Sequence, residues 1–292
     1  MTYAEKLRIS LLSARNADGG WPFRQGHSWT EPTALALLAL QASNDSGEVR
    51  SRAAAWIAQQ QSPDGGWPPC ATVPTSTWVS SLALLSLAHE SAYCNGCLKG
   101  VEWLTCQICP DITTLQGFIQ HRLGMSPARA PGGFPWFPGT AGWVIPTSFS
   151  ILALSCWAKR LPKSGLPEIA ARARKYLLSH RCADGGWNHG GSPQRSEASP
   201  SYAETTGLAL LALAQCQSPA LEAPLFLAQE FLRKPDSPEG AAWLLMGLAA
   251  HGRKPAETRP AMSLKTTRDI ALQLIACETL RSGHNVLLAS AA

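Results

Sequence analysis

The stretch Asp64-Gly65-Gly66-Trp67 decides the fold of this 292-residue chain, because the same four residues occur three times. The other two copies are Asp18-Gly19-Gly20-Trp21 and Asp184-Gly185-Gly186-Trp187, and Gly132-Gly133-Phe134 is a degenerate copy. The first two copies begin 46 residues apart. Self-similarity with a period of 20 to 50 residues is typical of proteins built from stacked structural repeats.

Each copy lies between two patterns typical of helices, an amphipathic one before it and an almost wholly apolar one after it. The amphipathic stretches are Tyr3–Ala14, Val49–Gln61, Gly100–Ile108, Glu168–His180 and Leu221–Arg233. The apolar stretches are Glu31–Gln41, Trp78–Ala88, Ser148–Ala158, Glu204–Gln215 and Glu239–Ala250. A helix that is apolar all round is buried, whereas an amphipathic helix keeps one face in water.

This alternation predicts an all-α fold, an α/α toroid with two concentric layers made of five to six helix hairpins. No strand-like alternation competes with the helical pattern. Trp103 to Asp111 repeat the pattern of Trp56 to Asp64, and an insertion containing Gln116–Met125 delays the next glycine pair until residue 132. The repeat extends over nearly the whole chain, so we expect one domain covering residues 1–292.

The composition excludes several classes of protein. Hydrophobic residues make up 45% and charged residues only 15% of the chain, against about 25% charged in ordinary domains, so disorder is excluded. The net charge of +5 is scattered with no Lys/Arg run, which argues against nucleic-acid binding. No apolar run reaches the roughly 18 residues of a membrane span, and Met1 to Asp18 lacks the apolar core of a signal peptide. We therefore expect a cytoplasmic protein with reduced cysteines.

The repeat resembles a known family. Gln61-x-x-Asp64-Gly65-Gly66-Trp67, followed by an apolar helix, is similar to the QW repeat of squalene–hopene and oxidosqualene cyclases. It also resembles repeats in the β subunits of protein prenyltransferases. Arg15 and Arg181 replace the glutamine in two copies. The resemblance implies a terpene cyclase-like α/α toroid that binds an isoprenoid or another hydrophobic small molecule in a central cavity.

Carboxylates at the leading ends of the apolar helices are the candidate acids. Glu31 and Glu204 occupy a slot that holds Trp78, Ile145 and Glu239 in other repeats, so the fold does not require a carboxylate there. By resemblance, Glu31-Pro32-Thr33-Ala34 stands where class II terpene cyclases carry the Asp-Asp-Thr-Ala part of their DxDD motif, whose middle aspartate protonates an alkene or epoxide. Glu204-Thr205-Thr206-Gly207 is a second match. This chain departs from the motif in having Glu, and only one carboxylate per site.

The helix dipole and burial shift the pKa values of Glu31 and Glu204 in opposite directions. The dipole of a helix stabilises a carboxylate in its first turn by about 0.3–1 kcal/mol, which lowers its pKa, whereas burial raises the pKa. Neighbouring helices lie roughly 8–10 Å apart, so Glu204 and Glu239 are expected to influence each other, with Glu31 across the ring. A purely structural role at the helix ends is the alternative.

Aromatic residues occur near the same ends and are candidate substrate-binding groups that would stabilise a carbocation. They are Trp29, Trp78, Trp143, Tyr202 and Trp243, with Glu239 beside them. Ordinary packing between hairpins is the alternative for these rings.

No metal site or cofactor is expected. Cys94-x-x-Cys97 and Cys106-x-x-Cys109 have the spacing of zinc ligands, but a helix between Cys97 and Cys106 would separate them by about 13 Å, too far for one ion. The Asp, Cys and His zinc ligands of the prenyltransferases have no matching cluster, and phosphate-binding loops are absent.

The leading hypothesis is therefore acid-initiated isoprenoid cyclisation in the cavity, with Glu31 or Glu204 as the acid. A non-catalytic toroid that binds a lipid or protein partner, or a prenyltransferase β-subunit-like protein, is the alternative. Two-domain cyclases are about twice this length, so a partner subunit completing the site and peripheral membrane contact are both compatible with the resemblance.

Overall fold

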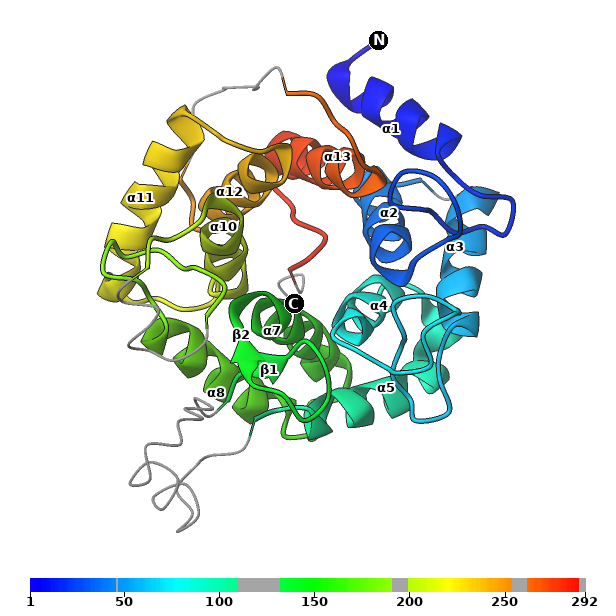
Figure 1. Cartoon of the computed structure of the whole chain (residues 1–292), viewed down its shortest axis with the longest axis horizontal. Helices are drawn as coiled ribbons and strands as arrows, with labels where there is room; N and C mark the ends of the chain where they lie inside the picture. The colour runs from blue at the N-terminus through cyan, green and yellow to red at the C-terminus, as the bar shows by residue number, and fades with distance from the viewer. Residues whose placement is uncertain (46, 110–131, 191–198, 254–261, 289–292) are drawn as a thin grey trace.

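The computed structural model describes residues 1–45, 47–109, 132–190, 199–253 and 262–288, so the insertion segment Gln116–Met125 lies outside the described residues. Its helices form a ring of two concentric layers (Figure 1), which confirms the predicted α/α toroid. The inner layer consists of α2 (Thr30–Ala42), α4 (Val79–Leu87), α7 (Val144–Arg160), α10 (Ala203–Ala212), α12 (Pro238–Ala250) and α13 (Thr267–Ser282). The outer layer consists of α1 (Tyr3–Ser13), α3 (Glu48–Gln59), α5 (Cys94–Cys106), α8 (Leu166–Ser179) and α11 (Glu222–Arg233).

The remaining regular elements are short. The 3₁₀ turns Ser91–Tyr93 and Pro219–Leu221 lead into α5 and α11. The strands β1 (Phe134–Pro135) and β2 (Gly142–Trp143) form an antiparallel pair that the sequence does not predict. It lies at the degenerate repeat, directly before inner helix α7.

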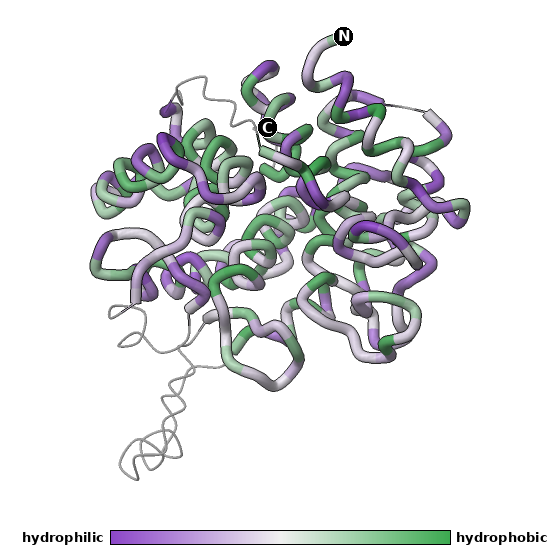
Figure 2. The backbone as a smooth tube through the Cα atoms, turned by 45° about the horizontal axis from the view of Figure 1, so that its top comes forward, coloured by the Kyte–Doolittle hydropathy of each residue, from purple (hydrophilic) through white to green (hydrophobic). Residues whose placement is uncertain are grey.

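The two layers divide polar and apolar surface as the patterns predict. Every residue of α4 is buried, and α2 is buried from Thr30 to Gln41 except at Glu31. The outer helices bury one stripe each, for example Leu7 and Leu11 of α1. Figure 2 shows the resulting alternation of hydrophobic and hydrophilic segments along the backbone. Burial of apolar surface in the inner layer is therefore the main force that holds the ring together.

The repeated tetrapeptide joins each outer helix to the next inner helix. The Trp67 indole N–H donates to the Ile57 carbonyl at the end of α3 (2.8 Å), and its backbone N–H donates to the Ser80 hydroxyl in α4 (2.7 Å). Asp64 Oδ1 accepts from the backbone N–H of Gly66 at 3.0 Å. Gly65, at φ +95°, has the left-handed conformation that favours glycine. The same indole bond links Trp21 to Leu11 and Trp187 to Leu177 (2.7 Å each), so the motif is structural.

Arg181 replaces the motif glutamine without loss of its contact. The Gln61 amide donates to the Gly96 carbonyl in the first turn of α5 at 3.0 Å. The Arg181 guanidinium donates to the carbonyl of Ala220, in the 3₁₀ turn that leads into α11, at 2.6 Å. Both side chains thus connect the motif to the start of the following outer helix.

Helix α13 is an inner helix that the sequence patterns missed. It packs between α12 and α2 and closes the ring, with α1 outside it (Figure 1). Its polar residues resemble those of an amphipathic outer helix, but Asp269, Gln273 and Glu278 are buried. Asp269 accepts bonds from the backbone at the start of the helix, and the Gln273 amide donates to the Pro238 carbonyl at 2.7 Å. Internal hydrogen bonds therefore permit polar residues in this part of the core.

Two glycines bring α10 and α12 unusually close. A Cβ atom at Gly207 would lie 2.4 Å from the backbone nitrogen of Leu244, and one at Gly247 would lie 2.5 Å from the Gly207 carbonyl oxygen. Helix backbones approach this closely only where side chains are absent at the crossing. The close approach sets Glu204 of α10 beside Glu239 of α12.

The segment after α13 turns into the middle of the ring (Figure 1). Asn285, Val286 and Leu287 are buried there, and His89 Nε2, just beyond the carboxyl end of α4, lies 3.0 Å from the Val286 carbonyl oxygen. The segment therefore covers the ring at the carboxyl ends of the inner helices. No helix of the described residues is long and apolar enough to cross a membrane.

Candidate functional site

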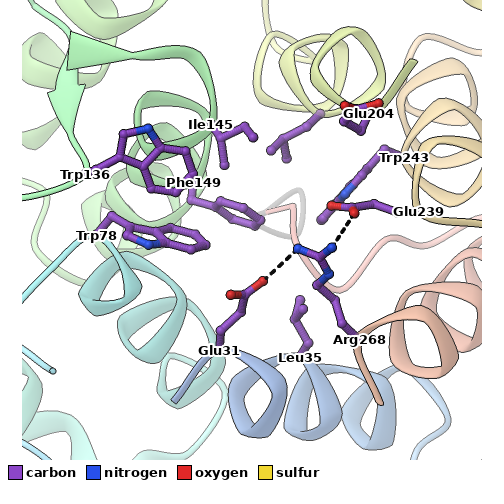
Figure 3. A pocket seen from close by; sticks show the side chains of 11 residues that line it. Glu31, Leu35, Trp78, Trp136, Ile145, Phe149, Glu204, Glu239, Trp243 and Arg268 are labelled. Atoms are coloured by element: carbon purple, nitrogen blue, oxygen red, sulfur yellow. Dashed lines mark hydrogen bonds and ion pairs between the residues drawn. The ribbon is translucent and has the colours of Figure 1, made fainter. Parts of the chain in front are cut away.

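A cavity of about 290 Å³ lies inside the ring at the amino-terminal ends of the inner helices (Figure 3). Five of the inner helices described above contribute to its wall, together with Trp78, directly before α4, and Trp136 of the loop after β1. The lining residues are Glu31, Leu35, Trp78, Trp136, Ile145, Phe149, Glu204, Leu208, Glu239, Trp243 and Arg268. The carboxyl groups and the guanidinium lie toward one side and most of the aromatic rings toward the other.

The wall is built from equivalent positions of the repeats. The second residue of an inner helix points into the cavity in five cases: Glu31, Ile145, Glu204, Glu239 and Arg268. In α4 the corresponding side chain is Trp78, directly before the helix. The residue four positions later lies on the same helix face and lines a deeper layer, as Leu35, Phe149, Leu208 and Trp243 do. The slot that the sequence comparison defined by Glu31, Trp78, Ile145, Glu204 and Glu239 is thus one layer of the cavity.

Arg268 links two of the three carboxylates. Its Nη2 atom lies 2.6 Å from Glu239 Oε2, and its Nη1 atom lies 3.3 Å from Glu31 Oε1 (Figure 3). The expectation that Glu31 lies across the ring from Glu239 is therefore wrong. The sequence patterns did not identify α13, which lies between α12 and α2 and whose Arg268 bridges the two acids. Arg268 belongs to the site and was missed because α13 was missed.

Burial dominates the electrostatics of the acids. It raises the pKa of Glu31 above its usual range, and the Arg268 guanidinium offsets only part of this effect. Burial also raises the pKa of Glu239, where attraction to Arg268 is opposed by repulsion from Glu31 and Glu204. The helix dipole favours the opposite shift but is the smaller effect. Burial alone would lower the pKa of Arg268, but the carboxylates of Glu239 and Glu31 outweigh it and keep the guanidinium charged.

The aromatic side of the cavity is a connected chain of rings. Trp78 meets Trp136 edge to face at a centroid distance of 4.9 Å and lies 5.7 Å from Phe149. Phe149 in turn meets the Trp243 ring at 5.5 Å. Trp136 and Phe149 were not among the sequence candidates. Phe149 was predictable, because it follows Ile145 by four residues, whereas Trp136 lies in a loop without helical periodicity.

The structure places three predicted aromatic residues outside the cavity lining. Trp29 precedes α2 and stacks on His27 at 4.8 Å. Tyr202 precedes α10 and packs against His189 at 5.0 Å, with 39% of its surface exposed. Trp143 lies on β2, paired with Phe134. Each of the three stands directly before its inner helix, two positions ahead of the residue that points into the cavity. Its side chain therefore points in a different direction from that residue.

The cysteine pairs lie on and after a continuous helix. Cys94, Cys97 and Cys106 all belong to α5, of which Cys94 and Cys106 are the first and last residues. Nine residues of helix separate Cys97 from Cys106 by about 13 Å. Within the described residues, no group of three or more His, Cys, Asp or Glu side chains has the arrangement of a metal site.

The fold and the cavity together define an α/α-toroid protein with an acidic, aromatic-lined central pocket. Known solved structures share this fold across almost the whole chain. A variant of the type II terpene cyclase MstE from Scytonema, in complex with geranylgeranyl dihydroxybenzoate, matches with a TM-score of 0.57 and 17% identity, over 97% of this chain and 79% of that one.

Toroid glycosidases match the fold of this chain with slightly higher TM-scores. The family 8 glycosyl hydrolase endoglucanase Cel10 from Klebsiella pneumoniae has a TM-score of 0.62 and 13% identity, over 96% of this chain and all of that one. An alpha-amylase from Clostridium perfringens has a TM-score of 0.65 and 9% identity, over 94% of this chain and 97% of that one. No protein-family model and no curated protein matches the chain. At these identities the likeness shows the toroid fold alone.

Proposed function

We propose that the cavity binds an isoprenoid or a similar hydrophobic compound and starts its cyclisation by protonation from Glu31. The observation that carries the proposal is the position of Glu31, a carboxyl group that is only 14% exposed, has a raised pKa and faces a wall of aromatic rings. An acid must hold its proton until the substrate arrives, and burial meets that requirement.

The uneven sharing of Arg268 favours Glu31 over Glu239 as the proton donor. One guanidinium neutralises one carboxylate, and its 2.6 Å contact with Glu239 is the closer of its two. We therefore take Glu31, whose contact with Arg268 is longer at 3.3 Å, as the proton donor. Once Glu31 has transferred its proton to an alkene carbon, Arg268 stabilises the carboxylate that remains. Arg268 thus makes proton transfer from Glu31 to the substrate more favourable.

The cavity also suits the cation that protonation creates. Three carboxyl groups face one guanidinium, so the lining has an excess of negative charge whenever two or more of the acids are ionised. The rings of Trp78, Trp136, Phe149 and Trp243 line the same cavity, and an aromatic face attracts a cation. Cation–π attraction reaches about 2 kcal/mol or more in a desolvated site. Glu204, which has no ion pair in the described part of the chain, is the carboxylate proposed to accept the final proton.

Cavity size limits the substrate. A volume of about 290 Å³ lies at the lower end of the range for small-molecule sites. The seven lining residues without a formal charge are aliphatic or aromatic. A compact hydrocarbon chain, or the reacting part of a longer one, fits this lining better than a hydroxyl-rich ligand.

Glycoside hydrolysis is the second candidate. The observation in its favour is that Glu31 and Glu204 reach into one aromatic-lined pocket from different inner helices, since glycosidases use one carboxyl group as acid and another as base or nucleophile. The toroid glycosidases also give the higher TM-scores. Against it stands the shortage of neutral hydrogen-bonding groups in the lining. A non-catalytic toroid that binds a lipid or a protein partner remains the alternative to both.

One assay separates these functions. The purified protein is incubated with geranylgeranyl dihydroxybenzoate, squalene and geranylgeranyl diphosphate, and in parallel with cello-, xylo- and malto-oligosaccharides, and products are separated by mass spectrometry. Cyclised isomers of a prenyl substrate, lost in Glu31→Gln and retained in Glu48→Gln, support the proposal. Glu48 is a matched control because it also begins a helix but is 85% exposed. Shortened oligosaccharides would establish the second candidate, and prenyl binding without turnover would establish the non-catalytic one.

A further inference from the structure

The pair Cys94-Asn95-Gly96-Cys97 lies on the outer surface of the ring and takes no part in the central cavity. Cys94 is the first residue of α5, and Cys97 follows one turn later on the same face. The helix has no side-chain cap at this end. Two thiols in the first turn of a 13-residue helix have the spacing of dithiol redox motifs, in which the first cysteine is reactive.

A guanidinium is fixed against the first sulfur. Arg160, the last residue of α7, donates from Nη1 to Cys94 Sγ at 3.0 Å. Its Nη2 atom donates to the Ala88 carbonyl, and its guanidinium carbon lies 5.7 Å from the centre of the Trp157 ring. The cation is therefore held in place by three contacts. A fixed positive charge in contact with the sulfur, at the start of a helix, is the electropositive surrounding in which reactive cysteines occur.

The two cysteines differ in a way that suits successive roles. Cys94 is partly exposed and open to a small reagent, whereas Cys97 is 1% exposed. Burial raises the pKa of Cys97 to about 12, and the nearby Cys94 adds to this shift. Cys97 is therefore a thiol in the reduced protein. This division, an accessible attacking thiol and a buried resolving thiol, is what intramolecular disulfide formation requires.

We propose that Cys94 and Cys97 form a redox-active dithiol that closes to a disulfide on reaction with a small-molecule disulfide. The Cys94 thiolate attacks one sulfur of oxidised glutathione and expels one glutathione thiolate. Cys97 then loses its proton to solvent, attacks Cys94 Sγ and expels the second glutathione thiolate. Two protein thiols are oxidised to one disulfide, and one glutathione disulfide is reduced to two glutathione thiols.

Helix α5 supplies an internal control. Cys106 is the last residue of the same helix and is exposed, but it lies at the end where the helix dipole disfavours an anion. If exposure alone governed reactivity, Cys106 would react before Cys94. The geometry predicts the reverse order.

The test treats the full-length protein with oxidised glutathione at pH 7.5, blocks the remaining thiols and maps the disulfides by peptide mass spectrometry. We expect a Cys94–Cys97 link in the wild type and in Cys106→Ser. We expect a glutathione adduct trapped on Cys94 in Cys97→Ser, and unmodified Cys97 in Cys94→Ser. Arg160→Gln should slow the reaction of Cys94 several-fold, because the cation in contact with its sulfur is lost, and Arg160→Lys should restore most of the rate. A link from Cys94 to another cysteine such as Cys156, no link at all, or faster modification of Cys106 would overturn the proposal.

Discussion

Replacing Arg268 by Met tests whether its guanidinium stabilises the ionised carboxyl groups of Glu31 and Glu239 in the cavity. The substitution removes the 2.6 Å contact to Glu239 and the 3.3 Å contact to Glu31 but keeps the volume of the side chain. Breaking a fully buried ion pair costs about 3–5 kcal/mol and breaking an exposed one at most about 1 kcal/mol. Arg268 is 34% exposed and its two partners 14% and 23%, so we expect a loss of about 2 kcal/mol at pH 8, after allowing for solvent screening.

The pH dependence of this loss is the sharper part of the prediction. Burial already raises the pKa values of Glu31 and Glu239, and without Arg268 both should rise further. A carboxyl group whose folded-state pKa is raised stabilises the fold below its unfolded-state pKa, and this stabilisation is lost as the pH rises through the folded-state pKa. The deficit of Arg268→Met should therefore shrink as the pH falls from 8 to 5, because Glu31 and Glu239 take up protons in the folded variant.

The assay is urea unfolding of the wild type and the variant at pH 5 and pH 8. Arg8→Met is the control, because Arg8 forms a 2.6 Å ion pair with Asp45 but is 45% exposed. Arg8→Met should lower the free energy of unfolding by less than about 1 kcal/mol. A deficit in Arg268→Met that is as large at pH 5 as at pH 8 would show that the arginine acts by packing alone and would refute the electrostatic reasoning.

The other predictions concern stability and packing. Glu31→Gln should leave the melting temperature at pH 8 unchanged or higher, because a neutral amide avoids the burial cost of the carboxylate; a clear decrease would contradict a raised pKa. Gly207→Ala should destabilise the fold by about 1–3 kcal/mol in urea unfolding, since its Cβ would lie 2.4 Å from the α12 backbone. Gly96→Ala, with its nearest contact at 3.5 Å, is the helical control and should cost nothing. Trp67→Phe should cost at least about 1 kcal/mol, because it leaves the buried Ile57 carbonyl without its indole donor; equal stability would make that bond dispensable.

The sequence predicted the toroid because its repeat determines both layers at once. Each tetrapeptide marks a turn, and the contrast between amphipathic and apolar stretches assigns the helices to the outer or the inner layer. The prediction failed at α13, where Asp269, Gln273 and Glu278 satisfy their hydrogen bonds inside the core. A hydropathy pattern reflects the free-energy cost of burying a polar side chain. It does not show whether a hydrogen-bond partner in the folded protein offsets that cost.

The candidate site was predictable where it follows the repeat. Glu31, Glu204 and Glu239 occupy equivalent positions, so a single alignment of the apolar helices finds all three. Arg268 was not a candidate because its helix, α13, was not predicted. Trp136 comes from a loop, where no periodicity indicates the direction of a side chain. The sign of the Glu31 pKa shift depends on how deeply the ring buries the helix end, which only the assembled structure provides.

The most direct test of the central claim is the deuterium content of a product formed in D₂O. The carboxyl proton of Glu31 exchanges with solvent before the substrate binds, so protonation of an alkene by Glu31 should place one deuterium on a carbon of each cyclised molecule. Product with one deuterium from the wild type and from Glu48→Gln, and none formed by Glu31→Gln, is the predicted result. Cyclised product without deuterium, or undiminished turnover by Glu31→Gln, would contradict the account.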